Sequence, residues 1–281
     1  RVRPQIILCY MTMNSGLLGA ATAWRTGVPF VVWMRLEGES LWNAKRWERT
    51  LALAIYRRAA GLWVQAARFA STLQAELERS GQAATWKGLA PRLRVLGNGL
   101  DLPDSTDDGL PPERRFLFVG RFVDQKDLPT LLAAMRHLDG CSLTLVGDGP
   151  LRATLEEAAR GAPVTFLGPR PHAEIAPLLR ASRALVLPSR QGGIPNVVLE
   201  ALAHGRPVVA TPVGAIPDLV QDGINGRLVP VGDATALAAA LRDLADDSRW
   251  RALAAAARPS VAHLAWPQLV SRVEAELASL V

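Results

Sequence analysis

Short apolar runs alternate with stretches of helical periodicity along most of the chain. In its second half, the apolar runs predict strands over residues 116–120, 142–147, 164–168, 184–189, 207–211 and 226–230. Apolar positions at helical spacing predict helices over residues 127–138, 151–160, 173–181, 196–204, 234–245, 248–257 and 266–280. Continuous apolar strands separated by amphipathic helices are typical of a parallel sheet covered on both faces. The pattern therefore predicts an α/β fold with a doubly wound sheet.

The first half of the chain repeats this alternation less completely. We expect strands over residues 5–10, 30–34, 62–64 and 93–96, and helices over 15–24, 42–60 and 69–78. A segment rich in proline and acidic residues then separates the two halves. These features predict an incomplete first domain over 1–101, a linker over 102–115, a second domain over 116–265 and a final helix over 266–281.

Composition excludes several classes of protein. The chain has 281 residues, of which 49% are hydrophobic, so it is neither disordered nor of low complexity. Cys9 and Cys141 lie far apart in the sequence and suggest neither a disulfide framework nor a metal cluster, which favours a reducing compartment. No apolar run reaches the roughly 18–20 residues of a spanning helix.

Positive charge and tryptophan are concentrated in the first hundred residues. That part holds 14 Lys and Arg against 5 Asp and Glu, whereas the remainder holds 18 against 21. It also holds six of the eight tryptophans. A basic, tryptophan-rich half suits an anionic surface, either lipid headgroups or nucleic acid. Without zinc-ligand spacing, an RNA-binding aromatic signature or a recognition helix, lipid is favoured over nucleic acid. An ordinary solvated basic surface is the alternative.

Residues 41–58 are the candidate membrane segment. They read as an amphipathic helix with Trp47, Leu51, Ala54 and Ile55 on one face and cations beside it. Tryptophan and arginine together are typical of a bilayer interface. The alternative is that this apolar face covers the sheet of the first domain.

The loops after the predicted strands carry the candidate chemistry, because ligands of doubly wound sheets bind beyond the carboxyl ends of the strands. After the strand over 116–120, Gly120 permits close approach to the backbone, and Arg121 and Lys126 can both contact a diphosphate. Solvated surface charges are the alternative. Gly147 opens the sequence Gly-Asp-Gly-Pro, which is either a tight turn or a ligand contact, and which is not a dinucleotide fingerprint.

The loop over residues 188–201 is the most informative. A strand ends at Ser189, a glycine pair comes next, and a helix begins near Pro195. Free amides at such a helix start bind phosphate, helped by the helix dipole. Glu200 lies one turn further, where its carboxylate can accept hydrogen bonds from two ribose hydroxyls. An ordinary surface glutamate is the alternative.

These motifs occur in a specific order. Val-Gly-Arg with Lys126, Gly-Asp-Gly-Pro, Phe-Leu-Gly168 and Pro-Ser189 are followed by Gly-Ile-Pro-Asn-Val-Val-Leu-Glu-Ala and by His204-Gly-Arg-Pro-Val-Val-Ala-Thr. The set closely resembles the group 1 retaining glycosyltransferases of the GT-B fold, which have two Rossmann-like domains. The resemblance is strong over residues 116–260, and residues 4–101 resemble the latter part of the first domain of that family.

The resemblance implies a nucleotide-sugar donor in the second domain and an acceptor on the first, with the final helix crossing back to the first domain. Arg121 and Lys126 match the pair that binds the donor diphosphate, and Glu200 matches the glutamate that holds the ribose. The other donor-binding positions are Gly120, Gly147, Gly168, Ser189, Gly193, Ile194, Pro195, Asn196 and Val197. Cations and amides can stabilise a leaving diphosphate, so the fold class implies neither a cofactor nor a bound metal.

Three departures from the family pattern stand out. Gly192 occupies the place of the first glutamate of the paired-glutamate motif, a carboxylate that contacts the donor sugar in the family. Glu37 or Glu39 lies near the place where the first domain often carries a histidine on the acceptor side. The opening strand and glycine-rich acceptor loop have no counterpart before Arg1, which predicts either an N-terminally truncated enzyme or a natural minimal variant.

The sequence therefore predicts a retaining hexosyltransferase that acts in polysaccharide or glycolipid biosynthesis. A UDP-sugar is favoured over a GDP-sugar as donor, and a glycan or lipid-linked molecule as acceptor. We expect a cytoplasmic protein, held peripherally at the inner face of the membrane through residues 41–58. The alternative is a catalytically impaired nucleotide-sugar-binding module, because of Gly192. A sugar epimerase of the same fold is disfavoured by the run that ends in Glu200.

Overall fold

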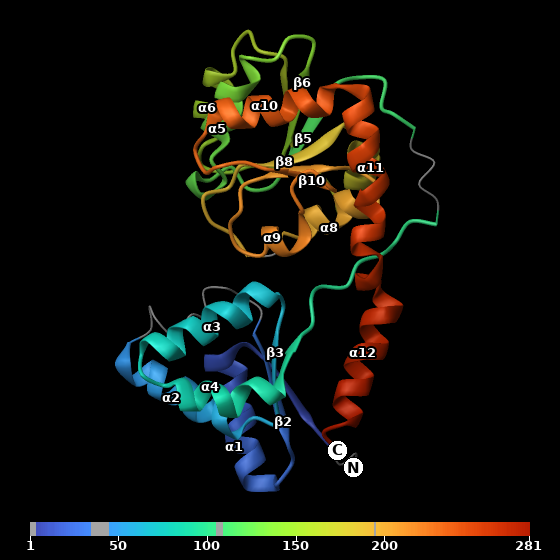
Figure 1. The fold of residues 1–281 in the computed structure, drawn as a ribbon. Helices are drawn as coiled ribbons and strands as arrows, with labels where there is room; N and C mark the ends of the chain where they lie inside the picture. The colour runs from blue at the N-terminus through green and yellow to red at the C-terminus, as the bar shows by residue number, and fades with distance from the viewer. Residues whose placement is uncertain (1–3, 35–44, 105–108, 194) are drawn as a thin grey trace. The chain divides into compact units, whose positions relative to one another are not determined.

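A computed structural model describes residues 4–34, 45–104, 109–193 and 195–281. The chain divides into two compact units (Figure 1). Unit 1 combines residues 1–99 with residues 266–281, and unit 2 contains residues 100–265. Each unit is built on one parallel sheet, of four strands in unit 1 and six in unit 2. The predicted α/β architecture with two parallel sheets is confirmed.

The sheet of unit 1 runs in the order β1-β2-β3-β4. Its strands are β1 (Ile7–Tyr10), β2 (Phe30–Met34), β3 (Gly61–Val64) and β4 (Leu93–Val95). The helices are α1 (Leu17–Thr26), α2 (Arg46–Arg58), α3 (Ala67–Arg79), α4 (Ala83–Leu89) and α12 (Trp266–Ala278), with a π-helical turn η1 (Met11–Gly16) before α1 and a 3-10 turn η3 (Ala90–Arg92) before β4. Helix α4 was not predicted from the sequence.

Helix α12 covers one face of the sheet of unit 1. Its Leu269 joins Val31, Trp33, Trp63 and Leu96 in a buried cluster. A salt bridge of 2.8 Å between Arg94 and Glu276 ties the helix to β4. Residues of the final helix therefore form part of the core of unit 1.

Helix α2 of unit 1 has other bounds than the predicted helix over residues 42–60. Residues 42–44 lie outside the described residues, and the helix ends at Arg58 rather than at residue 60. The buried face contains Ala52, Leu53, Ile55 and Tyr56. Of the predicted apolar face, Ile55 is buried, Leu51 and Ala54 are half-buried, and Trp47 is 60% exposed. The buried face also carries a polar contact, because the Tyr56 hydroxyl forms a buried 2.8 Å hydrogen bond with the Thr12 hydroxyl.

The sheet of unit 2 runs in the order β10-β9-β8-β5-β6-β7. Its strands are β5 (Arg115–Val119), β6 (Ser142–Val146), β7 (Val164–Gly168), β8 (Ala184–Leu187), β9 (Val208–Ala210) and β10 (Gly226–Leu228). The α-helices are α5 (Leu128–Met135), α6 (Arg152–Ala158), α7 (His172–Arg180), α8 (Asn196–Ala203), α9 (Ile216–Leu219), α10 (Ala234–Ala245) and α11 (Asp247–Val261). Short 3-10 turns are η4 (Asp124–Lys126) and η5 (Ala262–Leu264).

Helices cover the unit 2 sheet on both sides. Helix α5 packs against α6 and α10 in one layer, and α8 packs against α7 and α11 in the other (Figure 1). Between them, β5 and β8 lie at the centre of the sheet, and Phe116, Leu117 and Leu185 are fully buried. The strands read as continuous apolar runs because both of their faces are covered.

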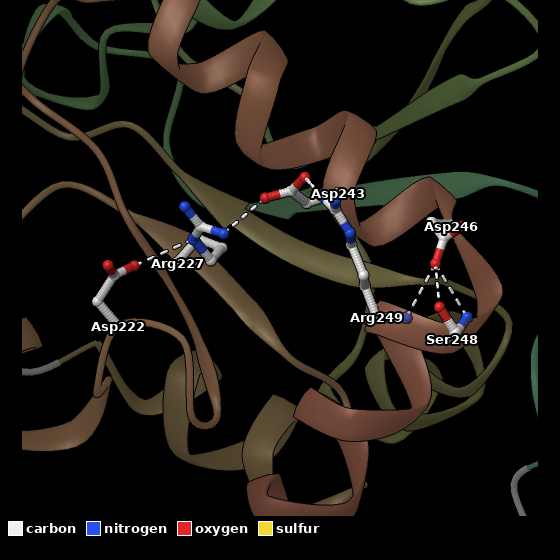
Figure 2. A network of polar contacts seen from close by, with 6 residues as sticks. All are labelled: Asp222, Arg227, Asp243, Asp246, Ser248 and Arg249. Carbon is white, nitrogen blue, oxygen red and sulfur yellow. Dashed lines mark hydrogen bonds and ion pairs between the residues drawn. The ribbon is translucent and has the colours of Figure 1, made fainter.

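A polar network links β10 to the two long helices of unit 2 (Figure 2). Arg227 lies between Asp222, at 3.1 Å, and Asp243 of α10, at 2.6 Å. Asp243 also pairs with Arg249 of α11. Asp246 accepts hydrogen bonds from the backbone N–H groups of Ser248 and Arg249, which caps the start of α11. The network fixes the corner between α10 and α11.

The boundary between the units differs slightly from the predicted one. Leu100 belongs to the core of unit 2, where its N–H donates to Leu264 O over 3.1 Å. Leu102 and Leu110 pack against the same core. Much of the described linker therefore lies on unit 2. No helix in the described ranges is long and apolar enough to cross a bilayer.

Candidate functional site

Three glycines link the ends of neighbouring strands in unit 2. The Gly120 N–H donates to Val146 O over 2.9 Å, and the Gly147 N–H donates to Gly168 O over 3.0 Å. Gly147 has a φ of 131° and a Cβ there would overlap the Gly120 carbonyl group. Only glycine at position 147 lets the loops after β5 and β6 approach this closely. The predicted glycine positions thus meet along one edge of the sheet.

Two cations stand in the loop after β5. Phe122 is fully buried, and its N–H donates to Asp148 O over 2.9 Å, which anchors the loop against the loop after β6. Arg121, the residue before it, is exposed. Lys126 is partly buried, and desolvation lowers the pKa of its ammonium group. Among the described residues no carboxylate forms an ion pair with Lys126, so a bound anion would stabilise its charged form.

The loop after β8 leads into helix α8. Ser189 is buried, and the backbone of Gly192 and Gly193 is in close contact with Gly214. The Ala215 N–H donates to Gly193 O over 3.3 Å. Helix α8 begins at Asn196, and its N-cap residue is Pro195, whose side chain makes no capping hydrogen bond. The helix start is therefore a place where backbone amides and the helix dipole favour an anion.

Glu200 lies in the second turn of α8. Its side chain is 27% exposed, and its Oε1 is 3.2 Å from Nε2 of His172, at the start of α7. His172 is 83% exposed. The carboxylate is therefore held at one oxygen by a side chain from the β7–α7 connection, while it keeps further acceptor capacity.

The structure brings most of the predicted donor-side residues to one edge of unit 2, because β7, β6, β5 and β8 are consecutive in the sheet. Ile194 lies outside the described residues, as do Glu37 and Glu39 of the predicted acceptor side. Sequence reasoning assigned no role to His172, Asp127 or Arg190, although the structure places them in these loops. No sequence signal links them, since their partners are distant along the chain.

The groups along this edge have the chemistry to contact phosphate oxygens and hydroxyl groups. The edge combines an exposed guanidinium, a partly buried ammonium, a helix start and a carboxylate with spare acceptor capacity. In residues 4–34, 45–104, 109–193 and 195–281, no group of three or more His, Cys, Asp and Glu side chains is arranged to hold a metal ion.

The chain is similar to several known proteins. The family model described as "Glycosyl transferases group 1" matches residues 113–247. A sulfoquinovosyl transferase of Arabidopsis thaliana is 31% identical over 173 residues, which make up 60% of this chain and 34% of that protein. A sucrose-phosphate synthase structure from Thermosynechococcus elongatus is 26% identical with a TM-score of 0.80, over 98% of this chain and 73% of that one.

A second solved structure, Anabaena HepE in complex with UDP, is 20% identical with a TM-score of 0.81, over 97% of this chain and 79% of that one. Each of the two units is built on a parallel sheet, and the chain superimposes on these glycosyltransferase structures; it therefore has the GT-B fold. Within that class, the family match over residues 113–247 and the 31% identity to the Arabidopsis relative confirm the resemblance to the group 1 glycosyltransferases that the motifs predicted. It spans 34%, 40% and 27% of the length of three curated relatives that it matches.

Proposed function

We propose that the chain is the core of a retaining glycosyltransferase that moves a hexose from a UDP-sugar to a glycan or lipid-linked acceptor. The observation that carries the proposal is the convergence of Lys126, the start of α8 and Glu200 at one sheet edge. Lys126 has no anionic partner among the described residues, and Glu200 keeps free acceptor capacity. In a nucleoside diphosphate, the diphosphate can pair with Lys126, and the ribose hydroxyls can donate hydrogen bonds to Glu200.

The proposed roles depend on charge. When the bond between the sugar and the diphosphate breaks, negative charge develops on the leaving phosphate oxygen. Arg121, Lys126 and the amides at the start of α8 stabilise that charge, and the gain is larger in a site that excludes water. Glu200 accepts hydrogen bonds from the ribose hydroxyls and so fixes the nucleotide. Gly120, Gly147 and Gly168 bring the backbone close to the ligand.

The choice of UDP has separate support. Anabaena HepE, whose fold this chain shares, was solved with UDP. We therefore propose UDP-sugars as donors ahead of GDP-sugars. The acceptor site belongs to unit 1, where Glu37 and Glu39 stay proposed contacts.

A peripheral location at the inner face of the membrane is proposed from unit 1. Lys45, Arg46 and Trp47 at the start of α2 are all exposed. These residues suit an anionic bilayer interface, next to which a lipid-linked acceptor and a polysaccharide or glycolipid product would lie.

The second candidate is a nucleotide-sugar-binding module that turns over poorly. Gly192 favours it, since no carboxylate stands where the family contacts the donor sugar. Measuring nucleotide-sugar binding and turnover together distinguishes the active glycosyltransferase from the binding module.

The test is a thermal-shift screen of nucleotide sugars, with transfer and hydrolysis assays on the donors that bind. UDP-sugars should raise the melting temperature, and Arg121→Ala should weaken UDP binding by roughly 1.5–3 kcal/mol, the range for a hydrogen bond to a charged group. Arg160→Ala is the matched control, because Arg160 is an exposed cation of unit 2 paired only with Glu157 in the described residues. No shift with any nucleotide sugar would refute the proposed function, whereas binding without turnover would favour the module.

A further inference from the structure

A salt bridge joins the two loops that the proposed donor site uses. Arg190, in the loop after β8, donates from Nη2 to Oδ1 of Asp127 over 3.1 Å. Asp127 comes directly after Lys126 and is the N-cap residue of helix α5. The Arg190 backbone N–H also donates to Gln125 O over 2.9 Å. Arg190 therefore holds the loop with the cations at two points.

Asp127 is an unusual residue in this position. It is 2% exposed, and its backbone has a φ of 48°, which is left-handed. Its Oδ2 is buried and has no hydrogen-bond partner among the described residues. A buried carboxylate needs a compensating cation, and Arg190 is the cation paired with it in the described ranges.

Arg190 is exposed, whereas the Asp127 carboxylate is buried. The Arg190 side chain is 57% exposed, so its guanidinium lies at the rim of the site and reaches inward to Asp127. Strands β5 and β8 are neighbours in the sheet, so the two loops start from adjacent strand ends. The contact sets the spacing between Lys126 and the loop that leads into α8.

We propose that Arg190 is a positioning residue for the diphosphate, acting through Asp127. It neutralises the buried negative charge of Asp127 next to Lys126, so that Lys126 and the start of α8 can face one anion. This inference rests on the proposed function, because the diphosphate belongs to the UDP-sugar proposed above. It adds two residues to that site for which the motifs give no role.

Removing Arg190 changes the charge balance beside the diphosphate. Without its guanidinium, the Asp127 carboxylate stays buried next to the diphosphate and repels it, and Lys126 is drawn toward Asp127. Removing the carboxylate as well relieves the repulsion. Asn suits position 127, because it tolerates left-handed backbone and keeps the Oδ1 acceptor.

The experiment measures UDP and uridine affinity by calorimetry for the wild type, Arg190→Gln, Asp127→Asn and the double variant. Arg190→Gln should weaken UDP binding about tenfold, within the range for a mutation that acts through a neighbouring group. Uridine binding should change little, because uridine has no diphosphate. Asp127→Asn alone should bind UDP nearly as the wild type does, and the double variant should recover most of the loss.

Two results would overturn the inference. Arg190→Gln with unchanged UDP affinity shows that the pair does not position the site. A double variant as weak as Arg190→Gln shows that Arg190 binds phosphate directly, rather than through Asp127. If Arg190→Gln does not fold, Arg190→Lys keeps the charge and loses the fork, and it should show a smaller UDP loss that Asp127→Asn again reverses. A wild type that does not bind UDP refutes the proposed function instead.

Discussion

Oε1 of Glu200 lies 3.2 Å from Nε2 of His172, although the two residues are 28 positions apart. The contact joins α8 to the connection between β7 and α7, and it holds one oxygen of the carboxylate. The remaining acceptor sites of Glu200 are suited to a vicinal pair of hydroxyls, such as those of a ribose.

Glu200→Gln should therefore weaken UDP binding by roughly 1.5–3 kcal/mol, the contribution of a hydrogen bond to a charged group. The glutamine keeps the size of the side chain and loses the charge, so folding should be preserved. Calorimetry with UDP and with 2′-deoxy-UDP measures the effect. The wild type should prefer UDP, and the variant should lose much of that preference; an undiminished preference would remove Glu200 from the ribose.

Gly192 is the position where a lost carboxylate can be restored. An added Cβ there meets nothing within 4 Å, and the φ of Gly192 is not positive. Gly192→Glu should therefore fold with the stability of the wild type. If the missing carboxylate limits turnover, this variant should raise transfer or hydrolysis of UDP-sugars while UDP affinity stays unchanged.

Gly193→Glu is the matched control for this test, because position 193 is also open. It adds the same charge one residue away from the family position and should give no gain. A stable Gly192→Glu variant with wild-type turnover on every donor tested would contradict the idea that the missing carboxylate limits the reaction.

Substitutions at Gly147 and Gly161 distinguish the cost of a strained backbone from the cost of a steric overlap. Both have positive φ, but a Cβ at 147 would overlap the Gly120 carbonyl, whereas a Cβ at 161 meets nothing within 4 Å. Gly161→Ala should cost about 1–2 kcal/mol of unfolding free energy, the penalty for left-handed backbone. Gly147→Ala should cost more, since the β5 and β6 loops must also move apart. Urea denaturation measures both, and equal losses would show that the close approach is unimportant.

The start of α2 tests the membrane proposal. Lys45, Arg46 and Trp47 are exposed, and each cation near an anionic bilayer contributes about 1 kcal/mol, an effect that salt screens. Liposome sedimentation should show binding that rises with anionic lipid and falls with added salt. Lys45→Glu with Arg46→Glu should abolish it, and Arg251→Glu, an exposed position in unit 2, should not. Equal binding to neutral and anionic vesicles, or no binding to either, would refute electrostatic docking.

The apolar pattern was sufficient to predict most of the elements. Strand β7 and helix α10 begin and end where predicted, because clear turn residues bound both segments. Helices α4 and α9 were not predicted, since each is short and has too few positions for a helical period to be recognised. The buried face of α2 also includes Tyr56, whose hydroxyl forms a hydrogen bond with Thr12. A periodicity that counts only apolar side chains leaves such a residue out of the buried face.

The sequence by itself determined the order of the glycines, the cations and Glu200, because each comes after a recognisable strand or opens a recognisable helix. It also predicted the family resemblance, because the motifs are local and keep their spacing. Only the tertiary structure decided which of these loops touch. Pairing of β5 with β8 brings Arg190 to Asp127 across 63 positions, and packing of α7 against α8 brings His172 to Glu200. Such contacts depend on strand order and helix packing, which fix distances between residues that no local pattern connects.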